Sequence, residues 1–249
     1  MIFLRSTLYQ FYQMISAIFF GLTGALFFFM PLKFRFTYIL GYAYSNMLAL
    51  KYLAGLDMEV IGKENLHDKA SIIMAKHQST WETYALQKVF PHHVWILKKQ
   101  LLHVPFFGWG LAQLEPIAIN RSTRKAAMQQ IIEQGKERLR DNLWIVIFPE
   151  GTRIPAGKKG KYKLGGARLA EATKAPIIPV AHNAGEYWAK GSFLIKPGTV
   201  KMIIGEAIYP EGKSPEEINN LVETWIEGQM EQITNPGLLP IKQIEQKVR

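Results

Sequence analysis

The sequence predicts an α/β fold, with a mixed and mostly buried sheet flanked by helices and an N-terminal hydrophobic helical hairpin. Two observations carry this prediction. From residue 57 onward, short β-rich runs alternate with stretches of helical periodicity, which is the pattern of a sheet covered by helices. Before that point, two long uncharged runs dominate the chain. We therefore expect two parts, hydrophobic helices over residues 1–56 and an α/β domain over residues 57–249.

The N-terminal part contains the uncharged runs Ser6 to Leu32 and Phe36 to Leu50, separated by a segment with Lys33 and Arg35. About 20 apolar residues cross a hydrocarbon core, so the first run is long enough to span a membrane and the second is marginal. A re-entrant or interfacial hairpin and a helical pair buried on a soluble domain are the alternatives. No small-residue cleavage site follows, so we expect the segment to remain attached as a membrane-associated hairpin.

Basic residues flank the two runs on both sides, at Arg5, Lys33, Arg35 and Lys51. Because positive charge gathers on the cytoplasmic side, both ends of the hairpin and the α/β domain are expected on the cytoplasmic side of the inner membrane. The chain has no cysteine, which excludes disulfides, thiolate metal sites and a cysteine nucleophile. The absence of cysteine is consistent with this location.

The formal net charge of +10 predicts an anionic partner. Nucleic acid, anionic lipid, an acidic carrier protein and a phosphorylated substrate all fit that charge. The sequence has no recognised nucleic-acid module, so we expect no nucleic-acid partner. Hydrolase, P-loop and dinucleotide motifs are also missing. A basic membrane-surface protein without enzymatic activity is the non-enzymatic alternative.

Seven runs after the hairpin are predicted to be strands, at residues 57–62, 71–75, 94–97, 116–119, 144–148, 177–181 and 201–205. Most are continuously apolar, which indicates burial on both faces. Helices are predicted over residues 80–90, 123–140, 166–173 and 215–233. Ser214 before Pro215, followed by two glutamates, is typical of a helix start. Pro179 favours a sheet edge or a bulge in the sixth strand.

The first candidate site is the segment KHQSTWE, residues 76–82, after the second predicted strand. A histidine between a strand and a helix projects into the opening where α/β folds bind ligands. His77, with an unperturbed pKa of about 6.5, can take a proton from an alcohol. Glu82 can orient His77 only if His77 lies in the turn before the helix. Alternatively, Ser79 and Glu82 form a capping box and the glutamate is structural.

The second candidate site is FPEGTR, residues 148–153, directly after the fifth predicted strand. A glycine-containing turn exposes backbone N–H groups, and Arg153 adds a planar set of donors for phosphate oxygens. An ordinary turn with a solvated arginine is the alternative. Residues 152–170, which we call the basic segment, contain six basic residues and no acid. We expect this segment to contact both a phosphate group and anionic lipid.

Two further stretches place cations beside an apolar strand or turn. Lys98 and Lys99 precede VPFFG at residues 104–108, and Arg121 follows Asn120. Cations in such positions suit a site that holds both a phosphate group and acyl chains.

The order of these motifs, ending with IPV at residues 178–180, resembles the glycerolipid acyltransferase family and in particular its bacterial 1-acylglycerol-3-phosphate acyltransferases. The resemblance covers roughly residues 60–210 and extends to the hydrophobic N-terminal segment. It implies that His77 is a general base oriented by the acid at position 82. It also implies that IPV supports the acyl chain. The residues that it assigns to the acceptor phosphate are Lys98, with or without Lys99, Arg121, Glu150, Gly151, Thr152 and Arg153.

The resemblance further implies transfer of an acyl group from acyl-CoA or acyl carrier protein to lysophosphatidate at an anionic membrane, without a metal or cofactor. Another lysolipid is the alternative acceptor. The sequence departs from the family pattern at two positions. The common family pattern has Asp where Glu82 stands, and Asp is frequent where Asn120 stands. An acyl-enzyme at Ser79 is less favoured, because helix capping already explains that serine.

Overall fold

The structure, a computed structural model, describes residues 1–120 and 124–239. Its centre is a seven-stranded sheet in the order β1-β7-β6-β2-β5-β3-β4. The β6–β7 pair is antiparallel and the other neighbouring strands are parallel, so the sheet is mixed as predicted. The strands are β1 (Leu56–Ile61), β2 (Ile72–Ala75), β3 (His93–Lys98), β4 (Ile117–Ile119), β5 (Trp144–Ile147), β6 (Ile177–His182) and β7 (Gly198–Ile204).

All seven predicted strands and all four predicted helices of the α/β domain are present. The predicted helices are α3 (Trp81–Val89), α5 (Arg124–Arg140), α6 (Gly165–Thr173) and α8 (Pro215–Ile233). Helix α8 begins with a complete capping box between Ser214 and Glu217. Two short helices, α4 (Phe107–Ala112) and α7 (Ala184–Tyr187), were not predicted, because six and four residues are too few to show a helical period.

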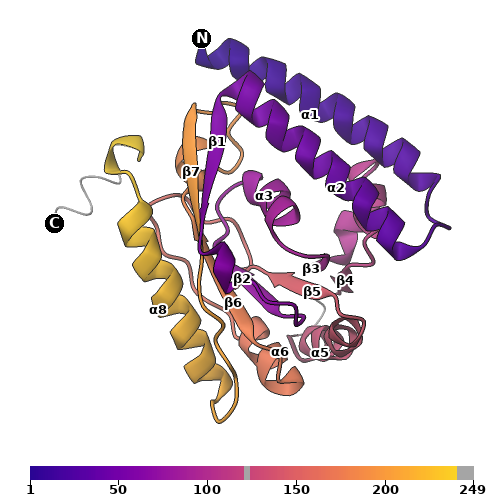
Figure 1. Cartoon of the computed structure of the whole chain (residues 1–249), viewed down its shortest axis with the longest axis vertical. Coiled ribbons are helices and arrows are strands. Elements are labelled where there is room, and N and C mark those ends of the chain that lie inside the picture. Colours follow the sequence, from indigo (N-terminus) through magenta and orange to yellow (C-terminus); the bar gives the residue numbers. More distant parts are fainter. Residues whose placement is uncertain (121–123, 240–249) are drawn as a thin grey trace.

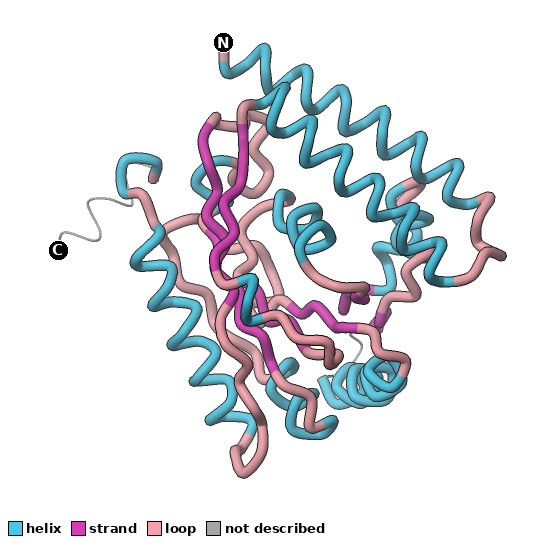
Figure 2. Tube along the Cα trace, viewed as in Figure 1, coloured by secondary structure: helices cyan, strands magenta, loops and turns pink. Residues whose placement is uncertain are grey.

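Helices cover both faces of the sheet, which explains the continuously apolar central strands. Helices α5, α6 and α8 pack on one face, and α3 lies on the other beneath the N-terminal helices (Figure 1). Figure 2 shows the strands passing between these two groups. Strands β2, β5 and β6 are buried at every position. Strand β1, which is not continuously apolar, is an edge strand and exposes part of its length.

Strand β6 contains Pro179 and lies inside the sheet, between β7 and β2. The edge position predicted for this proline is therefore wrong. The bulge is present: Ile177 pairs with Ile208 and Val180 pairs with Ile204, so two residues of β6 face three residues of the opposite segment. The bulge accommodates a residue that has no N–H to donate to the ladder. Residues 178–180, which the resemblance assigns to the acyl-chain site, are buried in this strand.

The predicted N-terminal hairpin is present as α1 (Ile2–Ala25) and α2 (Leu32–Ala49), followed by a π-helical turn at Leu50–Ala54. Within residues 1–120 and 124–239, none of the helices combines the length and the apolar character needed to cross a membrane. Helix α1 ends at Ala25, and it turns the polar side chains of Ser6 and Ser16 into the protein.

The hairpin packs firmly on the α/β domain. Arg35, one of the basic residues that flank the hydrophobic runs, forms a 2.7 Å ion pair with Glu115. On α3, the buried hydroxyl of Tyr84 accepts a hydrogen bond of 2.8 Å from Gln13 and lies 3.3 Å from the hydroxyl of Tyr42. These contacts join both helices of the hairpin to the helix that also carries Glu82.

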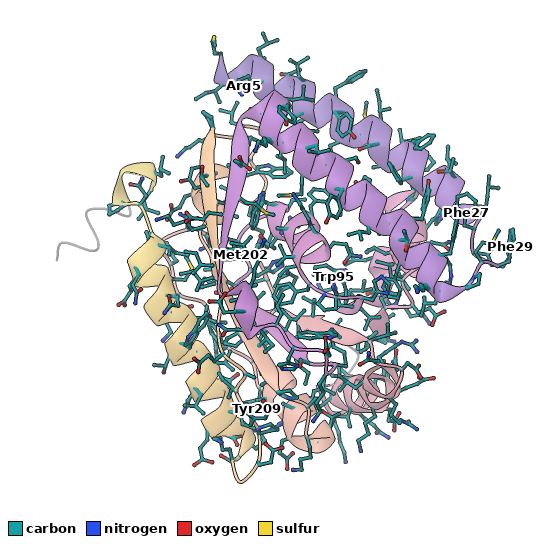
Figure 3. The ribbon with its side chains drawn as sticks, viewed as in Figure 1. Arg5, Phe27, Phe29, Trp95, Met202 and Tyr209 are labelled. Atoms are coloured by element: carbon teal, nitrogen blue, oxygen red, sulfur yellow. The ribbon has the colours of Figure 1, made fainter. Side chains whose placement is uncertain are left out.

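The outer side of α1 is apolar and exposed. Its large hydrophobic side chains recur every three or four residues and are about half exposed or more, a pattern that we call the apolar stripe. Figure 3 shows Phe27 and Phe29 at the turn between α1 and α2, far from Arg5 at the other end of the hairpin. The apolar stripe comprises Leu4, Leu8, Phe11, Ile15, Phe19 and Leu22.

Candidate active site

The two candidate motifs meet at the carboxyl ends of two neighbouring strands. His77 follows β2, and the FPEGTR segment follows β5, its parallel neighbour. The carboxyl ends of parallel strands lie next to one another, and this is where α/β folds bind ligands. The ring of His77 stacks on Phe148, with centroids 3.9 Å apart, and Phe148 also stacks on Trp95 of β3 (labelled in Figure 3). The motifs therefore form a single site.

His77 and Glu82 are in direct contact. The distance from Nδ1 of His77 to Oε1 of Glu82 is 2.6 Å, and the glutamate side chain is fully buried. His77 lies in the turn before α3, which is the position that this pairing requires. The Nδ1–H donates to the carboxylate, so the Nε2 lone pair is left to accept a proton.

Glu82 also holds the start of α3. Its carboxylate accepts hydrogen bonds from the backbone N–H groups of Gln78, at 3.1 Å, and Ser79, at 2.8 Å. The hydroxyl of Ser79 accepts from the N–H of Trp81 at 3.2 Å, and Ser79 is fully buried. The orienting and capping interpretations of Glu82 are thus compatible, because one carboxylate makes both sets of contacts. Ser79 lies just before Thr80, the N-cap residue of α3, and its contacts hold the turn that leads into this helix.

The backbone of His77 is fixed on both sides. Its N–H donates to Oε2 of Glu150 at 2.9 Å, and its carbonyl oxygen accepts from the N–H of Ile154 at 2.8 Å. Oε1 of Glu150 accepts from Nζ of Lys76 at 2.7 Å. Burial raises the pKa of Glu150, and Lys76 opposes this rise. The sequence predicted that Glu150 contacts the acceptor phosphate. In the structure its buried carboxylate accepts hydrogen bonds on both oxygens, and a carboxylate has no donor to offer an anion.

Several supporting residues were missed by the sequence analysis. Lys76 also donates to Oε1 of Glu227 on α8, at 2.7 Å. Nε2 of His182 donates to the carbonyl oxygen of Lys76 at 2.8 Å, and burial lowers the pKa of His182, so its ring is neutral. A lysine next to a buried apolar run was a usable signal for a buried ion pair. No sequence pattern connects that lysine to a glutamate near the other end of the chain.

The turn of the FPEGTR segment contains Gly151 with φ of 65°, a conformation that glycine adopts at little cost. The ammonium group of Lys163 lies against Gly151, where a Cβ would collide with it. Nζ of Lys190 is 3.5 Å from Oγ1 of the exposed Thr152. Together with the half-buried Arg153, these residues surround the turn with positive charge. Lys163 lies in the basic segment, whereas Lys190 comes from outside the motif.

Two predicted phosphate ligands remain. Lys98 is the last residue of β3 and is exposed. Because β3 is parallel to β5, Lys98 lies at the same end of the strands as His77. Arg121 lies outside the described residues; Asn120, just before it, follows β4 beside β3. In the register of β3 and β4, Lys98 pairs with Ile119, the residue before Asn120. Among the described residues, no group of three or more metal-ligating side chains lies together.

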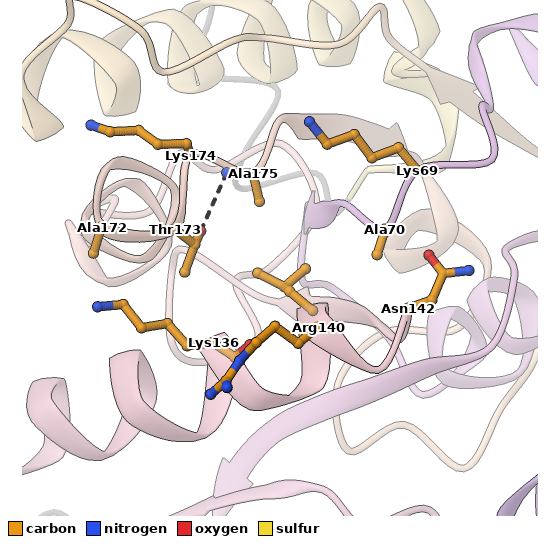
Figure 4. A pocket seen from close by; sticks show the side chains of 10 residues that line it. Lys69, Ala70, Lys136, Arg140, Asn142, Ala172, Thr173, Lys174 and Ala175 are labelled. Atoms are coloured by element: carbon orange, nitrogen blue, oxygen red, sulfur yellow. Dashed lines mark hydrogen bonds between the residues drawn. The ribbon is translucent and has the colours of Figure 1, made fainter.

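A groove of about 510 Å³ lies at the opposite end of the same strands and is separate from this site. Ala70 precedes β2 and Ala175 precedes β6, so the groove lies beyond the ends of those strands that are remote from His77. None of the described residues that line it is acidic. Figure 4 shows its four cationic side chains, Lys69, Lys136, Arg140 and Lys174.

Comparisons with known proteins agree with this geometry. The acyltransferase family model matches residues 57–183. The chain is 42% identical to the 1-acyl-sn-glycerol-3-phosphate acyltransferase of Pseudomonas aeruginosa over 232 residues, which is 90% of each chain. It is 38% identical to the enzyme of the same name from Saccharomyces cerevisiae over 137 residues, 53% of this chain and 44% of that one.

A solved structure is also similar. The crystal structure of the 1-acyl-sn-glycerophosphate acyltransferase PlsC from Thermotoga maritima superposes with a TM-score of 0.79 at 25% identity. The match covers 93% of this chain and 95% of that one. Since the family model spans both candidate motifs and a relative matches nearly end to end, the protein belongs to the acyltransferase family.

Proposed function

We propose that this protein is a 1-acylglycerol-3-phosphate O-acyltransferase of phospholipid biosynthesis. It transfers a fatty acyl group from an acyl thioester to the free hydroxyl of lysophosphatidate and forms phosphatidate. The observation that carries the proposal is the 2.6 Å contact between His77 and Glu82, next to the cationic turn at Gly151. A phosphorylated alcohol suits this site as acceptor, because an oriented base and an anion site lie together at the carboxyl ends of the strands. The names of the relatives agree with this acceptor.

The acceptor phosphate binds at the turn formed by Gly151, Thr152 and Arg153, with Lys98 and Arg121 as further cations. Arg153 offers a planar fork of donors that matches phosphate oxygens. Holding the phosphate there places the free glycerol hydroxyl near Nε2 of His77 and turns the reaction into an intramolecular step.

His77 then acts as general base. Nε2 takes the proton of the glycerol hydroxyl while the hydroxyl oxygen attacks the carbonyl carbon of the thioester. The new C–O bond gives a tetrahedral oxyanion. Backbone N–H donors at the turn stabilise that charge. When the carbonyl re-forms, the C–S bond breaks and the thiolate takes the proton back from Nε2. Glu82 stabilises the imidazolium between these two steps.

The acyl donor is acyl-CoA or acyl carrier protein. Both donors are anionic. The basic segment and Lys190 give the site a positive electrostatic potential, which attracts either donor. The steps above require neither a metal nor a cofactor, because the imidazole supplies the base and a thiol is a good leaving group.

The N-terminal helices, residues 1–56, hold the α/β domain, residues 57–249, at an anionic membrane surface. The apolar stripe of α1 supports this proposal, since exposed apolar side chains in a continuous row are typical of a lipid contact. With the basic flanking residues, we place the α/β domain on the cytoplasmic side of the inner membrane. There, the lipid acceptor and the soluble donor both reach His77.

Incubation of the purified protein with lysophosphatidate and each donor tests this function. Mass spectrometry of the lipid product is expected to identify phosphatidate. Lysophosphatidylglycerol serves as the competing lysolipid acceptor. Acylation of that lipid with no phosphatidate formed would refute the acceptor assignment, and no acylated lipid with either donor would refute the function.

A further inference from the structure

One carboxylate oxygen joins two parts of the proposed active site. Oε1 of Glu227, on α8, accepts a hydrogen bond of 2.7 Å from Nζ of Lys76 and one of 2.8 Å from the hydroxyl of Tyr162. Lys76 belongs to the turn that carries His77, and Tyr162 belongs to the basic segment. Lys76 and Tyr162 are both buried. The shared oxygen is therefore a fixed point between the proposed base and the proposed phosphate-binding segment.

The connection from Glu227 to the base is short. Nζ of Lys76 bridges Glu227 and Glu150, and the second oxygen of Glu150 holds the backbone N–H of His77. Lys76 is only 1% exposed, and a buried ammonium requires compensating carboxylates in good geometry. Loss of Glu227 would leave Lys76 with one partner and would free it to shift, together with the turn.

The connection to the anion-binding turn passes through Tyr162. Burial, followed by the charge of Glu227, raises the pKa of Tyr162, so the hydroxyl keeps its proton and donates. The next residue, Lys163, donates its backbone N–H to the carbonyl oxygen of Pro149 at 2.8 Å and lays its ammonium against Gly151. The position of Tyr162 thus sets the position of a cation at the turn.

We propose that Glu227 is a positioning residue that fixes the phosphate-binding segment relative to the His77 base. This inference rests on the proposed acyl transfer. Glu227 touches neither substrate; it acts through Lys76 on one side and Tyr162 on the other. A purely structural ion pair would affect the stability of the fold and leave the kinetics of the folded enzyme unchanged.

Steady-state kinetics of full-length variants tests this role, with lysophosphatidate and the donor that the wild type uses. Glu227→Ala is expected to lower kcat about tenfold or more and to raise KM for lysophosphatidate, since small displacements at a reacting centre are costly. Glu227→Gln is expected to recover most of both constants, because its amide oxygen can accept the same two bonds. Tyr162→Phe is expected to raise KM and to leave kcat close to the wild-type value.

Glu223→Ala is the matched control. Glu223 lies on the same helix and pairs with Lys159 at 2.7 Å, but that pair is at the surface. Its removal is expected to change neither constant. Circular dichroism and thermal melting check that each variant is folded. If Glu227→Ala does not fold, Tyr162→Phe and Glu227→Gln, which preserve volume, carry the test.

The outcomes separate the two proposals. A wild type that forms no phosphatidate contradicts the proposed function. An active wild type with a folded Glu227→Ala variant of normal kcat or normal KM contradicts the coupling role of Glu227. A Tyr162→Phe variant with unchanged KM, or a Glu227→Gln variant as impaired as the alanine variant, contradicts it as well.

Discussion

The backbone N–H of Ile154 donates a 2.8 Å hydrogen bond to the carbonyl oxygen of His77. Ile154 follows Arg153, so the proposed phosphate ligand is one residue away from a direct bond to the proposed base. Backbone atoms make this bond, and side-chain substitutions at either residue leave it in place. The spacing between base and arginine is thus set by the backbone at the ends of the two strands, and substitutions of the His77 and Arg153 side chains leave this bond in place.

His77→Ala is expected to abolish acyl transfer, because Nε2 is the proton acceptor. A general base contributes about 10²- to 10⁴-fold to the rate. The assay is phosphatidate formation, with circular dichroism and vesicle binding as controls for fold and membrane association. Turnover near the wild-type value would rule out His77 as the base.

Glu82→Gln is expected to lower turnover by orders of magnitude, because the imidazolium loses its compensating charge. From the sequence alone, glutamine would preserve the cap at little cost. The structure predicts a further loss of about 1–3 kcal/mol, because both buried oxygens accept hydrogen bonds and an amide group would face a donor. Thermal melting measures this loss.

Glu82→Asp is the companion variant, since it keeps the charge and restores the family pattern. We expect it to be more active than Glu82→Gln. A glutamine variant with wild-type turnover would leave Glu82 with a capping role alone.

Arg153→Lys is expected to raise KM for lysophosphatidate more than KM for the acyl donor, since a point charge replaces a bidentate fork. The two KM values are measured separately, each at saturating concentration of the other substrate. A matched control is Arg168→Lys, an exposed position in the same basic segment. Equal increases for both substrates would argue against a specific role in acceptor binding.

The stability of the protein is expected to fall between pH 6.5 and 4 in part through His93. Burial lowers the pKa of His93 to about 4, whereas the unfolded chain has a value of about 6.5. The unfolded state therefore binds this proton first as the pH falls, and stability is lost by up to about 1.4 kcal/mol per pH unit.

His93→Phe should show a shallower loss over that range in urea unfolding at several pH values. The buried His182 titrates in the same direction and remains in both proteins. Comparing variant with wild type therefore isolates His93. Equal pH dependence in the two proteins would show that His93 is not the source.

Charge placed on the apolar stripe is expected to release the protein from membranes. Phe11→Glu with Ile15→Glu puts two carboxylates on a face proposed to contact lipid, where an unpaired charge is costly. Cosedimentation with anionic phospholipid vesicles measures the effect. Leu221→Glu, at an exposed leucine of α8, is the control and should bind as the wild type does. Full sedimentation of the double variant would make the basic segment the main anchor.

The element order of the α/β domain was predictable because buried strands are continuously apolar and their ends carry glycine, proline or charge. The His77–Glu82 pair followed from placing His77 in a turn before α3. Strand order was beyond reach, because β7 inserts between β1 and β6 through pairing that no local pattern encodes. For the same reason, Pro179 suggested an edge although its bulge lies inside the sheet.

The roles of Glu150 and Glu227 show a second limit. Both glutamates lie in segments with clear local interpretations, an anion-binding motif and an amphipathic helix. Their common partner, Lys76, lies 74 residues from Glu150 and 151 residues from Glu227 along the chain. The pairing of β2 with β5 and the packing of α8 on the sheet bring the three together. Buried ion clusters of this kind depend on tertiary contacts that periodicity does not report.

The bonds from Gln13 and Tyr42 to Tyr84 have a consequence for protein engineering. A hairpin that served only as a tether could be replaced by any other anchor. Here, replacement would strip a buried phenol of its neighbours two residues from Glu82, on the same short helix. A grafted anchor would therefore have to reproduce an amide donor and a second hydroxyl at this spot, or the enzyme would lose its arrangement of α3 along with its old attachment.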